Sequence, residues 1–245
     1  MSPVRHPILF AMLFVVSSLF LAHPSPAQDG QSATFDVSLK GINAGILAFS
    51  GTIDGKGYAV SGRLESTGLV GAIRKVRYDA KSRGSVSGSK FTPTRYEEKA
   101  DTGKRKSDAV MEYKSGVPQV KAYSPPRTPS ERDVDPATQK GTVDPLTALF
   151  AVLRDVEASE ACKVNVFMFD GQRRSQLSLA APKTDGDTIN CAGEYRRLEG
   201  FSAKEMAEKQ RFAFTLTYAP VEGGKVRVVS VAMDTLYGRA ALTRR

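Results

Sequence analysis

No histidine lies in the part of the chain that is expected to form the folded domain. The two histidines of the chain, His6 and His23, lie in the first 27 residues, which have the three parts of a secretory signal. A chain cleaved after Ala27 would contain no histidine. This excludes Ser-His-Asp and Cys-His catalysis, histidine metal ligands and histidine pH switches. An enzyme would then need carboxylates alone as acid and base, as in glycosidases.

Three short patterns match parts of known catalytic or metal sites. Asp-Thr-Gly at 101–103 is the triplet of aspartic proteases, but its charged neighbours favour a hairpin turn. Ser-Gly-Ser-Lys at 87–90 has the Ser-x-x-Lys spacing of penicillin-binding proteins, but its composition predicts a turn between strands. Asp133, Asp135 and Asp144 could hold calcium, but their spacing is irregular and Asp144 is better explained as a helix cap. We therefore predict no catalytic residue, no metal ligand and no cofactor.

The two cysteines, Cys162 and Cys191, predict a single disulfide if the protein is exported to an oxidising compartment. In the chain-entropy model this bond would contribute about 3 to 4 kcal/mol; the alternative is two buried thiols. In a flat meander the pair would lie on the first and third of three strands, about 9 to 10 Å apart, beyond disulfide reach. Either the sheet bends there or Cys162 lies in the preceding loop.

One segment, 144–156, is predicted to form the long helix of the domain. Asp144 suits the N-cap and Pro145 the first helical position. Apolar residues recur at helical spacing and extend most of the way round the helix, so it must be enclosed by the rest of the chain. The helix either fills the core or lines a cavity for a ligand. In the second case, the residues expected to contact the ligand are Leu146, Leu149, Phe150 and Leu153.

Most of the remaining chain alternates between apolar and polar residues, as in Phe35, Val37 and Leu39 against Asp36 and Ser38. This period of two is typical of antiparallel strands with one solvated face. The predicted fold is mainly β: a large curved antiparallel sheet of about 12 strands, open or partly closed like a barrel, wrapped around the central helix. Residues 67–72 are predicted as an irregular link and 202–209 as a short helix.

The expected organisation is a signal peptide, 1–27, followed by a single β-rich domain, 28–245. Within it, the proline-rich segment 124–141 is expected to be a loop over the sheet, although a domain linker is the alternative.

Export to the periplasm is predicted from the N-terminus. A basic start with Arg5, an apolar run over 8–22 and small residues at 25 and 27 indicate a signal cleaved after Ala27. The run is shorter than the about 20 residues of a membrane-spanning helix, although an uncleaved anchor is the alternative. No transmembrane segment is expected in the cleaved chain.

The formal net charge is +9 for the whole chain and +8 once Arg5 is removed. Such a surplus favours anionic envelope surfaces, or serves solubility. The export signal argues against nucleic acid as a partner.

Three segments and the cysteine pair carry a resemblance to a known family. They are Gly-Ile-Asn-Ala-Gly at 41–45, Val-Asp-Pro-Leu-Thr-Ala-Leu-Phe at 143–150, and Phe-Asp-Gly-Gln-Arg at 169–173. Together they resemble the exported bacterial family catalogued as domain of unknown function 3108. The resemblance implies a periplasmic or envelope-associated protein with a curved antiparallel sheet. It brings no established activity and no catalytic residues.

Three functions are compatible with these features. The first is a non-enzymatic envelope protein that binds a lipid or a lipoprotein acyl chain in the concavity of the sheet. The second is a protein-interaction or scaffolding role in envelope integrity, through strand edges or the 124–141 loop. The third is a hydrolase that depends on a pair of carboxylates, for which the sequence offers no obvious pair.

Overall fold

The computed structural model describes residues 29–245, so the predicted signal peptide and its cleavage site lie outside the described residues. Fourteen strands form one antiparallel sheet, with three short α-helices. The strands are β1 (Asp29–Leu39), β2 (Ile42–Asp54), β3 (Gly57–Ser66), β4 (Arg77–Ser87), β5 (Lys90–Asp101), β6 (Lys106–Lys114), β7 (Val117–Ser124), β8 (Val156–Glu157), β9 (Asn165–Phe169), β10 (Arg174–Asp185), β11 (Thr188–Glu199), β12 (Arg211–Pro220), β13 (Lys225–Thr235) and β14 (Gly238–Arg244). The helices are α1 (Gly68–Ile73), α2 (Pro145–Leu153) and α3 (Ala203–Glu208), and the 3₁₀ turns are η1 (Pro136–Thr138), η2 (Ala158–Glu160) and η3 (Glu222–Gly224). The predicted curved, mainly β architecture is confirmed, with two more strands than expected.

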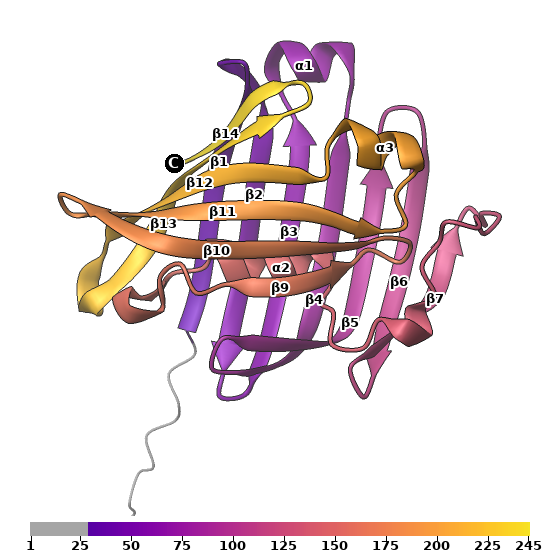
Figure 1. Cartoon of the computed structure of the whole chain (residues 1–245), viewed down its shortest axis with the longest axis horizontal. Helices are drawn as coiled ribbons and strands as arrows, with labels where there is room; N and C mark the ends of the chain where they lie inside the picture. The colour runs from indigo at the N-terminus through magenta and orange to yellow at the C-terminus, as the bar shows by residue number, and fades with distance from the viewer. Residues whose placement is uncertain (1–28) are drawn as a thin grey trace, which may run out of the picture.

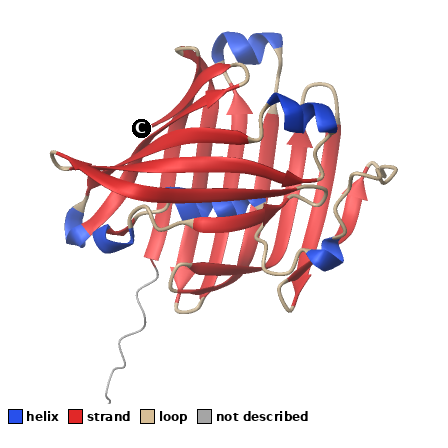
Figure 2. Cartoon of the chain, viewed as in Figure 1, coloured by secondary structure: helices blue, strands red, loops and turns tan. Residues whose placement is uncertain are grey.

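The sheet curls so that the two halves of the chain face each other. Its order is β7-β6-β5-β4-β3-β2-β1-β14-β13-β12-β11-β10-β9, and β8 pairs with β13. The last strand therefore joins the first, with Phe35 opposite Arg244. In Figure 1, β2–β6 form the rear layer and β9–β12 cross it at a steep angle, with α2 between the layers. Figure 2 shows how little helix accompanies the strands.

The segment before α2 lies between the two edge strands, β7 and β9. The Gly141 amide donates to the Gly116 carbonyl beside β7 at 2.8 Å. On the other side, Val143 pairs with β9 in parallel, through hydrogen bonds with Phe167 and Phe169. Gly141, the last residue of the predicted loop, and Val143 after it therefore supply backbone partners at both ends of the sheet, which leaves less of each edge open to other chains.

Helix α2 ends earlier than the predicted 144–156 segment. It stops at Leu153, and Val156 instead pairs with Val226 of β13. The Asp155 carboxylate binds Arg227 at 2.7 Å and Arg244 at 3.6 Å. These contacts hold the segment after the helix against the sheet.

Of the two other short helices, one was predicted from the sequence and one was missed. The predicted helix at 202–209 is confirmed as α3, which begins with a reciprocal capping box between Ser202 and Glu205. The expected irregular link at 67–72 is wrong, because these residues form α1. All six residues of α1 are apolar or glycine, and a single turn and a half carries no periodicity from which a helix can be predicted.

Helix α2 is enclosed as its composition requires. Phe150 is fully buried and meets Phe49 of β2 and Phe91 of β5 edge to face, with ring centroids 5.8 and 5.9 Å apart. Glycines let the helix approach the sheet: a Cβ at Gly51 would lie 2.7 Å from the Phe150 ring, and one at Gly62 would lie 2.7 Å from Leu146 Cδ1. The strands under α2 are thus shaped to receive it.

Gly51→Ala and Gly62→Ala should each destabilise the domain by about 1 to 3 kcal/mol, because the added methyl group overpacks the α2 contact. Urea unfolding monitored by circular dichroism measures this. Gly30→Ala is the matched control, since its Cβ would have no atom within 4 Å. Equal losses for all three variants would show that α2 is not closely packed against β2 and β3.

Candidate functional site

The N-terminus of α2 is held by a buried group of hydroxyls around one carboxylate. Asp144 caps the helix by accepting from the Thr147 amide at 2.9 Å. Its second oxygen accepts from the Thr147 hydroxyl at 2.7 Å and from Ser82 of β4 at 2.8 Å. Tyr58 of β3 completes the group through a 2.7 Å hydrogen bond with the Thr147 hydroxyl. We call these four residues the Asp144 network; it ties α2 to β3 and β4.

The Asp144 carboxyl has no exposed surface, and the Thr147 amide and the hydroxyls of Thr147 and Ser82 donate hydrogen bonds to it. Burial raises the pKa of Asp144, and the hydrogen bonds from Thr147 and Ser82 lower it in part. Burial and the charge of Asp144 also raise the pKa of Tyr113. The Tyr113 hydroxyl is buried without a hydrogen-bond partner among the described residues. A carboxyl enclosed in this way positions the helix; it cannot touch a substrate.

The four apolar helix residues proposed as ligand contacts lie in the core. Leu146, Phe150 and Leu153 are buried, and Leu149 is partly buried against the same cluster. None of them lines any of the three pockets described below. Their contact with a ligand stays a prediction of the sequence.

The predicted Cys162–Cys191 disulfide is present, with the Cα atoms 5.4 Å apart. Cys191 lies in β11, and Cys162 lies in the loop between η2 and β9. The second of the two expected geometries is therefore the one observed. The bond fastens the segment after α2 to the layer that covers it.

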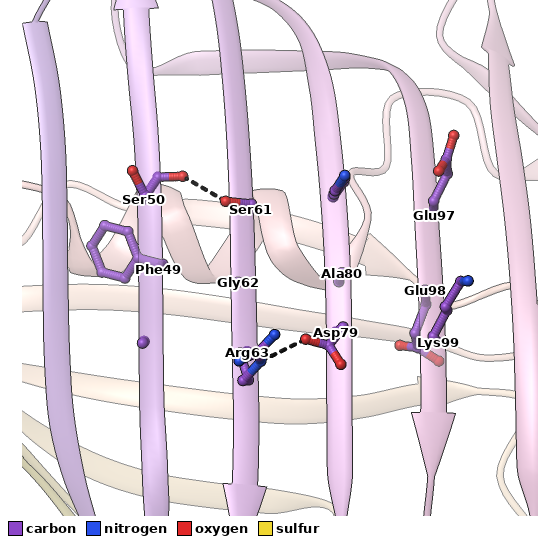
Figure 3. A pocket seen from close by; sticks show the side chains of 12 residues that line it. Phe49, Ser50, Ser61, Gly62, Arg63, Asp79, Ala80, Glu97, Glu98 and Lys99 are labelled. Carbon is purple, nitrogen blue, oxygen red and sulfur yellow. Dashed lines mark hydrogen bonds and ion pairs between the residues drawn. The ribbon is translucent and has the colours of Figure 1, made fainter.

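A wide depression lies on the outer face of β2–β5. Its volume is about 660 Å³, and a second depression of about 520 Å³ shares Ser50, Ser61, Lys81 and Glu97 with it. In Figure 3, the Ser61 hydroxyl donates to the Ser50 carbonyl, Arg63 and Asp79 are joined by an ion pair, and α2 lies behind the strands. Arg95 likewise pairs with Glu97 at 2.6 Å. Serine and charged side chains line this surface, and two of its arginines are paired with carboxylates.

A more enclosed pocket of about 290 Å³ opens between the two layers at the C-terminal end of α2. We call it the end pocket. It is formed by the β4–β5 turn, residues 141 and 143, the end of α2, η2, β9 and β12. Its apolar lining comprises Phe91, Val143, Ala151, Val156, Val164, Val166, Phe167 and Tyr218. The size is close to the lower limit of small-molecule sites, about 300 to 1,000 Å³.

Three cations and one carboxylate line the end pocket: Lys90, Arg154, Lys163 and Glu160. Lys90 and Lys163 are exposed, and Lys163 pairs with Glu160 at 3.3 Å. Arg154 lies deeper, with its guanidinium 5.6 Å from the centre of the Phe91 ring. Burial raises the pKa of Tyr218 to about 12, and the charge of Arg154 acts in the opposite direction. The end pocket thus combines apolar side chains with a surplus of positive charge.

The motifs considered from the sequence have structural roles here. Residues 101–103 form the β5–β6 turn, in which Asp101 accepts from the Gly103 amide at 2.9 Å. Asp133 binds Arg127, Asp135 caps η1 and Asp144 is in the core, so the three do not meet. The described residues contain no group of three or more potential metal ligands. Residues 87–90 form the predicted turn, but Lys90 within it faces the end pocket.

A family model described as protein of unknown function DUF3108 matches residues 34–243. The chain belongs to the DUF3108 family. No curated protein matches it. Among solved structures, the DUF3108 chain is similar to a β-barrel-like protein of domain of unknown function DUF1849 from Brucella abortus, with 11% identity and a TM-score of 0.48 over 87% of this chain and 94% of that one. Family membership confirms the resemblance found in the sequence and assigns no activity.

Within residues 29–245 of the DUF3108 chain, no helix has the length and apolar character needed to span a bilayer.

Two buried tyrosines of the DUF3108 chain allow a matched comparison. Tyr58→Phe should cost about 1 kcal/mol of unfolding free energy, because it removes the hydrogen bond to Thr147. Tyr113→Phe should leave stability unchanged or raise it slightly, since its hydroxyl has no partner among the described residues. Urea unfolding of both variants tests this, and a larger loss for Tyr113→Phe would contradict it.

The Asp144 network should make the stability of the DUF3108 domain depend on pH. Because the folded state favours protonated Asp144, this carboxyl contributes most below the pH at which it titrates in the unfolded chain, about 4. The contribution is lost as pH rises through the higher folded pKa. D144N keeps an acceptor for the cap and removes the charge, so its stability relative to wild type should rise between about pH 4 and pH 8.

Urea unfolding across this pH range measures the difference, and D79N is the control. Hydrogen bonding by Arg77, and then by Arg63, lowers the pKa of Asp79. The stability of D79N relative to wild type should therefore fall over the same range. The interpretation of Asp144 would be wrong if both variants followed the same trend.

Proposed function

We propose that this protein is a non-enzymatic protein of the bacterial periplasm that binds a single-chain anionic amphiphile, such as a fatty acid, in the end pocket. The observation that carries the proposal is that a pocket between the layers combines eight apolar side chains with three cations and one carboxylate. An acyl chain would lie along Val143, Val156 and Val166, and its anionic end would face Lys90 and Lys163.

The volume of the end pocket favours one chain over two. At about 290 Å³, it falls at the small end of ligand sites, so a phospholipid with two full acyl chains would not fit inside it. Each buried methylene contributes about 0.8 kcal/mol. A medium-length chain can therefore gain substantial affinity without contacting Leu146, Leu149, Phe150 or Leu153.

Export to the periplasm is supported by the sequence and by the cysteine pair. The Cys162 and Cys191 Cα atoms are 5.4 Å apart in a disulfide, and structural disulfides persist mainly in oxidising compartments. The signal predicted over 1–27 would supply the route. Both features suit an envelope protein.

A binding role is preferred to a carboxylate-dependent hydrolase because of where the carboxylates lie. Asp144, whose pKa is raised, is fully buried. The end pocket contains a single carboxylate, Glu160, which pairs with Lys163. Glycosidase chemistry needs two carboxylates flanking one bond, about 5 to 10 Å apart.

A scaffolding role remains the second candidate, and the outer depression on β2–β5 is the observation that favours it. Its volume of about 660 Å³ and its polar, charged lining suit a protein surface better than a lipid. The edge strands suit it less, because residues 141 and 143 already pair beside both of them.

The proposal is tested by isothermal titration with dodecanoate, using the chain from residue 28 onward, which contains all fourteen strands. Ala151 lines the end pocket and is itself buried, so A151L should fill part of the space and weaken binding by at least about tenfold. The double variant K90E/K163E should weaken it to a similar extent by removing the positive rim. Thermal unfolding should show that A151L remains folded.

The controls separate the two parts of the site. K56E changes an exposed lysine in the β2–β3 turn, outside the end pocket, and should bind as wild type does. Dodecyltrimethylammonium has the same chain with a positive head and should bind more weakly than dodecanoate. Absence of dodecanoate binding, or equal binding by A151L, would refute the proposed site.

A further inference from the structure

One end of the molecule carries a group of apolar side chains that the fold does not use. Ile73 and Leu69 of α1 are 88% and 73% exposed, and Tyr237 of the β13–β14 turn is 75% exposed. Ile42, the first residue of β2, is 54% exposed. Singly exposed apolar residues are ordinary, but a group of them at one place marks an interaction surface.

These residues belong to adjoining segments. The Thr67 hydroxyl before α1 donates to Asn43 in β2, just after the β1–β2 turn, at 3.0 Å. On the other side of that turn, the Lys40 amide donates to the Arg239 carbonyl at 2.8 Å. Figure 1 shows α1 and the β13–β14 turn at the same end of the molecule. We call this surface the α1 end.

Helix α1 is held in place by its backbone and not by burial of its side chains. None of its six residues is buried. The Ser66 hydroxyl accepts from the Val76 amide at 2.8 Å and donates to the Arg74 carbonyl at 3.0 Å, closing the chain at both ends of the helix. A Cβ at Gly71 would lie 2.9 Å from the Ser66 carbonyl oxygen. The fold thus presents Leu69 and Ile73 outward on a fixed support.

Cations surround this apolar group. The Arg74 guanidinium donates to the Thr102 carbonyl at 3.1 Å, which brings the β5–β6 turn beside α1. In the four segments 40–43, 68–75, 101–106 and 234–239, seven residues are basic and two are acidic. The basic residues are Lys40, Arg74, Lys75, Lys104, Arg105, Lys106 and Arg239; the acidic ones are Asp101, which pairs with Lys106 at 3.4 Å, and Asp234.

We infer that the α1 end docks on the surface of an anionic phospholipid bilayer. Leu69, Ile73 and Tyr237 would enter the boundary between headgroups and acyl chains, and the surrounding lysines and arginines would meet the lipid phosphates. Tyrosine suits this depth because its ring is apolar and its hydroxyl is polar. The inference uses none of the residues of the end pocket, so it stands apart from the proposed function.

Charge decides between a bilayer and a second copy of the chain. In a two-fold dimer the same patch faces itself, so seven basic residues would oppose seven others around the apolar contact. An anionic bilayer would instead present negative charge to these seven basic residues. The structure therefore favours the bilayer as the occupant.

Co-sedimentation with vesicles tests the inference, using the chain from residue 28 onward so that the apolar run at 8–22 does not contribute. The protein should bind vesicles that contain phosphatidylglycerol at least about tenfold more tightly than vesicles of phosphatidylcholine alone. Binding should weaken at about 1 M salt, where the Debye length is about 3 Å. L69E/I73E and K75E/K104E should each lose at least about tenfold in affinity.

K56E/K114E is the matched charge control. Lys56 and Lys114 are exposed at the other ends of β3 and β6, so this variant should bind vesicles as wild type does. Circular dichroism should show that L69E/I73E is folded, because neither side chain is buried. Loss of binding in the control to the same extent, or wild-type binding by L69E/I73E, would overturn the inference. A dimer in sedimentation equilibrium that L69E/I73E dissociates would also overturn it, since the patch would then be an interface between copies.

Discussion

The enclosure of α2 is the constraint on which the rest of the structure depends. A helix with apolar residues on nearly all sides has no face to give to water, and here both layers of one curled sheet cover it. Its N-terminus still has amides that need acceptors. Asp144 meets that need from inside the core, where the hydroxyls of Ser82 and Thr147 in turn donate to its carboxylate. The network fixes the position of α2 on β3 and β4, and the cost is a buried carboxyl with a raised pKa.

The position of α2 determines where the end pocket lies. Gly51 and Gly62 let one side of α2 approach β2 and β3 closely, and Phe150 fills the centre between Phe49 and Phe91. After Leu153 the chain must leave the helix to reach Arg227 and Arg244 through Asp155. The layers therefore meet less tightly past the end of α2, where small Ala151 and the valines of β8 and β9 leave a space.

The sequence predicted the features that depend on local pattern. Alternating residues such as Phe35, Val37 and Leu39 indicated strands, Asp144 and Pro145 marked the start of the helix, and the cysteine pair was foreseen. Features that depend on distant contacts were missed. Val156 continued the apolar pattern of the helix, but it pairs with β13 instead. Helix α1 is too short for periodicity to identify it. The cations of the end pocket come from separate segments around 90, 154 and 163, so no spacing in the sequence connected them. Lys90 was noted only inside a Ser-x-x-Lys match, which was interpreted as a turn between strands.

The two proposed surfaces lie at opposite ends of β4. Strand β4 begins just after α1 and ends at the turn that contributes Lys90. Its 11 residues at about 3.3 Å each separate the ends by about 35 Å, close to the thickness of a bilayer's hydrocarbon core. A protein docked through α1 would therefore hold the mouth of the end pocket away from that bilayer. A ligand could not pass directly from the docked leaflet into the pocket. The geometry instead suits a protein that is anchored at one membrane surface and exchanges its ligand with the aqueous compartment beyond it.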